Sequence, residues 1–181
     1  MQDKKRVQAK IVEEMIKIGK DISSFSTYSC RPKTKDELKF IIKSRVFNEG
    51  TKCDLNDIDT SLINDMSKLF YKSRFNGNIS KWDVSKVEDM TGMFSGSRFN
   101  GDISRWDVSR CQLMVGMFSG SKFNGNISEW NVSNVEDMWG MFNESYFNQD
   151  ISKWKLRKDC KIVIMFDKCP IKEEFKPKYL I

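Results

Sequence analysis

The chain has 181 residues, of which 39% are hydrophobic and 31% charged, and this composition is typical of one soluble globular domain. It holds no histidine, which removes the commonest general base and metal ligand, and its five cysteines lack the CxxC spacing of zinc sites. No run of residues is long and apolar enough for a transmembrane helix or a signal peptide. We therefore expect a cytoplasmic protein of a bacterial host cell rather than one on a cell surface, with no membrane contact.

The N-terminal fifty residues are predicted to form two helices. Apolar residues recur at helical spacing over residues 4–20, which indicates a first helix. Thr34 and Glu37 form a capping-box pattern that begins a second helix, and Asn48 to Gly50 end it. The second helix would cover the first face of the repeats that follow, so we predict a helical extension and cap over residues 1–50. The pattern leaves open whether the first helix packs on the repeats or binds a partner.

The centre of the chain repeats with a period of 24 residues. Three near-identical copies begin at Phe75, Phe99 and Phe123 and read FNGNISKWDVSKVEDMTGMFSGSR, FNGDISRWDVSRCQLMVGMFSGSK and FNGNISEWNVSNVEDMWGMFNESY. One unit is too short to bury its own apolar residues, whereas stacked units bury each residue under its equivalent. We predict a solenoid of about five turns over residues 51–170 and a capping tail over residues 171–181. Each unit would turn the same side chains inward, in the first copy Phe75, Ile79, Trp82, Val84, Val87, Met90, Met93 and Phe94.

Local patterns within one unit predict an α/β repeat. Asn78 to Val84 alternates between polar and apolar residues, and its copies would pair as short parallel β-strands. Gly92 to Gly96 is short and glycine-rich, and we interpret it as a single helical or 3₁₀ turn on the other side. The asparagines after each phenylalanine would form a column that satisfies backbone groups at a corner, namely Asn76, Asn100, Asn124 and Asn148.

The repeated pattern FNxDISxWDVSxVxxMxxMFxxS resembles the BspA-like repeats of bacterial surface proteins and mycoplasma lipoproteins, a divergent type of leucine-rich repeat. The resemblance covers about Cys53 to Phe166, well over half of the chain. It implies a right-handed, leucine-rich-repeat-like scaffold that binds other macromolecules, and it implies no catalytic residue.

Carboxylates recur with the repeat, at Asp83, Asp107, Glu88-Asp89 and Glu136-Asp137. Paired carboxylates can perform acid–base chemistry or hold calcium. Their repetition at the period of the stack indicates solvated ladders instead. We therefore expect no enzyme activity, no metal and no cofactor.

Positions that vary between the copies are the candidates for recognition, because constant positions build the fold. The middle copy replaces an acidic pair with Gln112 and Leu113 and carries Val115 two residues later. Together with Trp139 and Tyr146 they would form an apolar patch typical of protein interfaces, unless local repacking buries them. A second candidate is a column whose charge changes sign, made of Lys81, Arg105, Glu129 and Lys153.

These observations favour a non-enzymatic scaffold that binds a protein partner through its repeat surface. One setting for it is a phage or mobile element, whose accessory protein would inhibit a host defence protein. An alternative is a surface antigen or adhesin of the BspA-like type. Another is a nucleic-acid-binding protein that uses its basic ends, since residues 1–50 and 155–181 carry net charges of +5 and +4, against −3 for residues 51–154.

Overall fold

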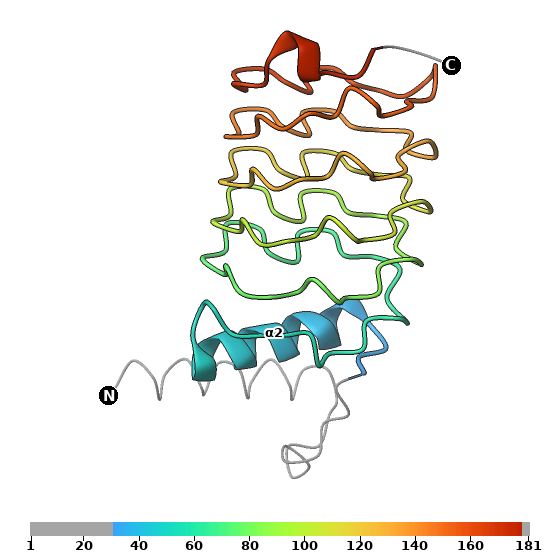
Figure 1. The fold of residues 1–181 in the computed structure, drawn as a ribbon. Coiled ribbons are helices and arrows are strands. Elements are labelled where there is room, and N and C mark those ends of the chain that lie inside the picture. The colour runs from blue at the N-terminus through green and yellow to red at the C-terminus, as the bar shows by residue number, and fades with distance from the viewer. Residues whose placement is uncertain (1–30, 179–181) are drawn as a thin grey trace.

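The computed structural model describes residues 31–178, and the chain winds into a stack of similar coils (Figure 1). Helix α2 (Lys35–Glu49) lies across the N-terminal end of the stack, and a short 3₁₀ helix, η2 (Glu173–Phe175), lies at the C-terminal end. The helix predicted over residues 4–20 lies outside the described residues. We number the coils from the N-terminus as coil 1 (residues 51–74), coil 2 (75–98), coil 3 (99–122), coil 4 (123–146) and coil 5 (147–170).

Helix α2 begins where the capping-box pattern predicts it. The Thr34 hydroxyl accepts a hydrogen bond from the Glu37 N–H at 3.2 Å, which satisfies one backbone donor of the first turn. The helix ends at Gly50, whose φ of 93° is a conformation that glycine adopts without strain. Its buried residues are Leu38, Phe40 and Ile42, and of these Leu38 and Ile42, one turn apart, belong to the core that the helix shares with the coils.

The predicted α/β class is wrong for the part of the chain that the structure describes. Residues 31–178 contain α2 and η2 but no continuous strand, only isolated parallel bridges between coils. In the segment predicted as a strand, Asn78 alone forms a bridge, to Asp54. The chain then turns, because the Trp82 N–H donates to the Ile79 carbonyl at 3.2 Å. A turned backbone cannot present the evenly spaced donors of a parallel sheet. The fold is therefore not the α/β, leucine-rich-repeat-like solenoid that we predicted.

Neighbouring coils pair instead along tight turns, which we call the turn ladder: residues 65–72, 89–96, 113–120, 137–144 and 161–168. The N–H groups of Met93 and Ser95 each donate at 3.1 Å to the carbonyl three residues earlier. Those of Met90 and Gly92 each donate at 2.8 Å to a carbonyl of coil 3. Turn bonds and inter-coil bonds thus alternate along the chain, and every backbone donor in this part of coil 2 except that of Thr91 has a backbone acceptor.

Left-handed backbone at two positions in each coil closes these turns. Gly92 and Gly96 have φ values of 60° and 65°. The equivalent residues of coil 5 are Ile164 and Lys168, with φ values of 50° and 52°. A helical or 3₁₀ turn requires negative φ at every residue. The helical turn predicted for Gly92 to Gly96 is therefore a run of β-turns.

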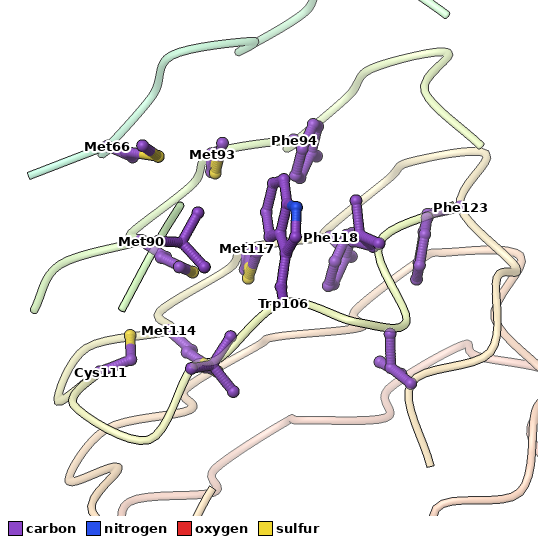
Figure 2. Packing of buried hydrophobic residues seen from close by; sticks show 14 of the residues in the cluster. Met66, Met90, Met93, Phe94, Trp106, Cys111, Met114, Met117, Phe118 and Phe123 are labelled. Carbon is purple, nitrogen blue, oxygen red and sulfur yellow. The ribbon is translucent and has the colours of Figure 1, made fainter. Parts of the chain in front are cut away.

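The inward positions of the repeat are confirmed. All eight apolar residues predicted to face inward in the first copy are at most 3% exposed. Equivalent rings lie over one another: the centroids of Phe94 and Phe118 are 5.6 Å apart with an interplanar angle of 2° (Figure 2). Full burial of one such side chain contributes about 1.5–3 kcal/mol, so these columns supply most of the attraction between coils.

The tryptophans join the coils by a buried hydrogen bond as well as by packing. The Trp106 indole N–H donates to the Ile79 carbonyl at 3.2 Å, 27 residues earlier. Trp82, Trp130 and Trp154 make the same bond to Leu55, Ile103 and Ile127 at 2.8, 3.1 and 3.0 Å. Each indole donor therefore has a partner although the ring is buried.

The predicted asparagine column is also confirmed. The side-chain oxygen of Asn76 accepts the Asn100 N–H at 2.8 Å, and that of Asn100 accepts the Asn124 N–H at 2.7 Å. Asn148 continues the column and accepts the Lys172 N–H at 3.1 Å. Each asparagine thus satisfies a backbone donor of the next coil at a corner, where no carbonyl is in position to do so.

The segment after coil 5 follows the path of one more coil for a short distance. The Phe175 carbonyl accepts the Ile151 N–H at 2.9 Å, and Ile171 is buried. This segment covers the part of coil 5 that begins at Phe147. It leaves the turn ladder of coil 5, residues 161–168, without a following coil among the described residues.

Candidate functional site

The candidate apolar patch lies on the outer surface of the turn ladder. Leu113 and Trp139 are 37% and 48% exposed, and Val115 is half-buried. Val115 and Trp139 occupy equivalent positions in coils 3 and 4, and the Gly116 N–H bonds to the Trp139 carbonyl at 2.8 Å. Local repacking therefore does not bury these side chains, and the structure brings three of the predicted residues together.

Leu113 stands where the neighbouring coils carry a carboxylate with a structural role. It pairs by parallel bridges with Asp89 on one side and Asp137 on the other. Asp89 accepts the Thr91 N–H at 2.7 Å, and Asp137 accepts the Trp139 N–H at 2.9 Å. Leu113 has no oxygen to offer, and the corresponding N–H, that of Val115, has no acceptor among the described residues. Coil 3 has thus lost a turn cap and gained an exposed apolar side chain.

Two further apolar residues extend the patch into coil 5. Val163 is 61% exposed and follows Val115 and Trp139 in the same column, and Ile164 is 41% exposed beside it. Ile164 side-chain carbons lie 3.8 Å from the position of a Cβ on Gly140. The sequence comparison missed both because it aligned only the three near-identical copies. Extending the 24-residue period by one step from Trp139 would have found Val163. We call Leu113, Val115, Trp139 and Val163 the turn-ladder patch.

Tyr146 and Gln112 lie apart from this column. Tyr146 is 57% exposed at the corner after the turn ladder, and the Lys122 ammonium sits 3.4 Å from its ring centroid. A hydrogen bond from the same ammonium lowers the pKa of the Tyr146 phenol. Gln112 is exposed and lines a shallow polar cleft of about 230 Å³ with Glu88 and Glu136, at the margin of the patch.

The second predicted column is exposed and belongs to another part of each coil. Lys81, Arg105 and Glu129 are all exposed and succeed one another at the period of the repeat. Glu129 lies 3.9 Å from the Lys153 ammonium, and both side chains are more than three-quarters exposed, so this ion pair contributes little. The structure does not bring this column into the turn-ladder patch.

The repeated aspartates act as turn caps, whereas the repeated glutamates Glu88 and Glu136 line the polar cleft. Asp107 accepts the Ser109 N–H at 3.0 Å, and hydrogen bonds from Ser109 lower the pKa of its carboxyl group. Asn131 accepts the Ser133 N–H in the same way in the next coil, so the position needs an acceptor rather than a charge. Among residues 31–178, no three histidine, cysteine or acidic side chains gather closely enough to hold a metal ion. No helix in this range is both long and apolar enough to cross a membrane.

One family model matches the coils described above. Its description reads "Mycoplasma protein of unknown function, DUF285", and the matched segments are residues 42–154 and 106–174. The chain belongs to this family. Neither the curated proteins nor the solved structures give a match.

The family match places every candidate residue within the shared repeats. The patch, Tyr146 and the column that begins at Lys81 all lie between residues 42 and 174. Leu113 lies where the two matched segments overlap, so the family's repeats run without interruption through the coil that carries it.

Proposed function

We propose that this member of the family is a non-enzymatic, cytoplasmic scaffold that binds a protein partner through the turn-ladder patch. The observation that supports the proposal most directly is Leu113, which replaces a carboxylate that caps a turn in the coils on both sides. The resemblance of the repeats to BspA-like repeats, which bind other macromolecules, supports it as well. As the setting we propose a phage or mobile element whose accessory protein inhibits a host protein.

The substitution at Leu113 works against stability in two ways. A missing turn cap forgoes about 1 kcal/mol, and an apolar side chain that stays 37% exposed recovers only part of its transfer free energy. A coil shaped for folding alone would carry aspartate here, as coils 2 and 4 do. A partner that covers Leu113 and accepts the unpaired Val115 N–H would offset both effects.

Trp139 supplies the anchor that such an interface needs. It is 48% exposed, and its backbone N–H is already fixed by Asp137. The backbone that carries the indole is therefore set before binding, and tryptophan is enriched among residues that dominate binding energy. The cleft at the margin of the patch holds Glu88 and Glu136 beside Arg110 and Arg157, so its charges are balanced and the apolar side chains define the partner: one with an apolar projection.

The chain itself suggests the sharpest test, because Leu113→Asp restores the residue of the neighbouring coils. We expect this variant to be as stable as the native protein or more stable, by up to about 1 kcal/mol, since the Val115 N–H regains an acceptor. We expect it to weaken partner binding at least tenfold, because a carboxylate then faces the partner's apolar surface. Trp139→Thr, which copies Thr91 of coil 2, should also weaken partner binding at least tenfold.

The measurement is an affinity capture from native host lysate with and without nuclease, followed by titration of the captured protein against the variants. Arg105→Ala, on the other exposed column, serves as a control that should bind like the native protein. Equal affinity of Leu113→Asp and native protein would refute the patch. Recovery of nucleic acid alone, or of proteins that nuclease releases, would refute protein binding in favour of the basic ends.

A further inference from the structure

Four columns of hydrogen bonds in the turn ladder run in the same direction along the stack, whereas the first residue of a ladder segment donates the other way, as the Asp89 N–H does to the Asn64 carbonyl. The Met66 N–H donates to the Asp89 carbonyl, and the N–H of the same peptide unit, on Met90, donates to Leu113. Three more columns of hydrogen bonds run in the same direction, and they begin at the N–H groups of Lys68, Phe70 and Lys72. The peptide dipoles in each column are therefore aligned head to tail, as they are in an α-helix.

This alignment leaves opposite groups unpaired at the two ends of the stack. At the N-terminal end, the carbonyls of Asp65, Ser67, Leu69 and Tyr71 accept no backbone hydrogen bond within the described residues. At the other end the N–H groups that would continue the four columns, together with that of Val163, have no acceptor among the described residues. We call the four that end the columns the donor edge: those of Ile162, Ile164, Phe166 and Lys168. The donor edge is the positive pole of four aligned columns, comparable to several helix N-termini side by side.

The four carbonyls at the N-terminal end form the negative pole of the columns, and basic residues of helix α2 lie close to it. Helix α2 lies over it, and the Lys35 ammonium bonds the Asp65 carboxylate at 2.6 Å and the Ser67 hydroxyl at 2.8 Å. Lys39 and Lys43 of the same helix line a groove of about 350 Å³ against coil 1. Cations thus gather at the end of the stack that presents carbonyl oxygens.

Within residues 31–178, no backbone acceptor pairs with the positive pole. Residues 155–178 contain eight basic and four acidic side chains, for a net charge of +4. Lys161 and Lys168 flank the donor edge and pair with Asp137 and Glu144 of coil 4 at 3.6 and 2.7 Å, while Asp167 contributes one carboxylate within the edge itself. Four unpaired donors and a surplus of basic side chains therefore coincide at one end of the molecule.

We infer that the donor edge binds an acidic polypeptide segment of a partner protein. The segment would accept hydrogen bonds through carboxylate and carbonyl oxygens, and basic residues of the coil 5 region would pair with its charge. A second copy of this chain cannot pair donor edge to donor edge, because both rows donate. An ordinary β-strand is a poor fit as well, since its edge alternates donors with acceptors. The site is separate from the interface proposed through Leu113 and Trp139.

The probe is a fluorescent decapeptide of alternating aspartate and glycine, which places an acceptor at every second residue and can adopt the positive φ of the turn ladder. The matched control peptide alternates lysine with glycine. The first readout is amide hydrogen exchange in the native protein. Without peptide, we expect fast exchange at the donor-edge amides and slow exchange at the equivalent amides of coil 4. The aspartate peptide should slow exchange at the donor edge and leave the coil 4 amides unchanged. The equivalents are Met138, Gly140, Phe142 and Glu144.

The second readout is the affinity of a variant that lacks one N–H donor of the edge. Ile162 has a negative φ and no partner for its N–H, so Ile162→Pro deletes the donor without breaking a hydrogen bond of the fold. Ile162→Ala loses the same side chain and keeps the N–H. We expect Ile162→Pro to bind the aspartate peptide about fivefold more weakly than Ile162→Ala.

Several outcomes would overturn the assignment. Slow exchange at the donor edge without peptide would mean that the edge is already covered. Equal affinity for the two peptides, or for the two Ile162 variants, would show that the donors take no part. Tighter binding of a ten-nucleotide single strand, lost in Ile162→Pro, would assign the edge to phosphates. A concentration-dependent dimer in sedimentation, lost in the same variant, would assign it to a second copy.

Discussion

The aromatic columns make a quantitative prediction at Phe118, which lies in the middle of the stack. Its side chain is fully buried, and its ring centroid lies 5.6 Å from each of Phe94 and Phe142 and 4.3 Å from Phe123. Truncation of a buried phenylalanine costs about 3–5 kcal/mol, so Phe118→Ala should lower the free energy of unfolding by about 4 kcal/mol. For a chain of this length that corresponds to a fall in Tm of roughly 10 °C.

The same column contains a matched control. Phe166 in coil 5 is half-buried and stacks on Phe142 alone in this column, at 5.8 Å. Phe166→Ala should therefore cost about half as much, about 2 kcal/mol. Urea unfolding followed by tryptophan fluorescence measures both values, and the dependence of the free energy on urea should stay unchanged. If Phe118→Ala costs no more than Phe166→Ala, the columns do not hold the stack together as argued.

Three further predictions concern single polar or reactive groups. Asn100→Ala should lower the free energy of unfolding by about 1 kcal/mol, because the Asn124 N–H loses its acceptor; an unchanged urea midpoint would contradict the role of the column. Burial raises the pKa of the Cys111 thiol to about 12, so a thiol reagent at about pH 8 should modify it only after unfolding. Labelling of Cys111 in the native protein would contradict this and show that coil 3 opens. Hydrogen bonds from Ser109 lower the pKa of Asp107 in the folded state, so this carboxylate stabilises the fold above its ordinary pKa, and the contribution is lost as the pH falls through the folded pKa. Asp107→Asn should therefore flatten the decline of Tm between about pH 5 and pH 2. An identical decline in the two proteins would refute the assignment.

The sequence alone predicted the columns because a fixed period places equivalent residues over one another whatever path the chain takes between them. The inward positions from Phe75 to Phe94 and the asparagine column that contains Asn100 follow from the 24-residue step alone. The capping box likewise predicted α2, since Thr34 and Glu37 act through local hydrogen bonds. None of these conclusions depends on secondary structure.

The backbone path was the part that sequence patterns misjudged. The alternation of Asn78 to Val84 is that of a strand, yet the coils pair through turns that need left-handed residues. Gly92 and Gly96 reveal this requirement in coil 2, but Ile164 and Lys168 conceal it in coil 5. The signal is therefore visible only when glycine positions are compared between copies. The sequence comparison identified the patch at Leu113 and Trp139. It missed Val163 because coil 5 departs from the consensus of the three near-identical copies.

The buried indole bonds also bear on how the chain acquires its structure. Each one joins residues only 27 positions apart, and no contact between distant parts of the chain is needed to complete a coil. Proteins dominated by such short-range contacts fold quickly, because little loop-closure entropy opposes each step. A coil can dock as soon as the tryptophan of the next one has left the ribosome. The stack is thus suited to form progressively during synthesis, one layer at a time, rather than in a single collapse of the finished chain.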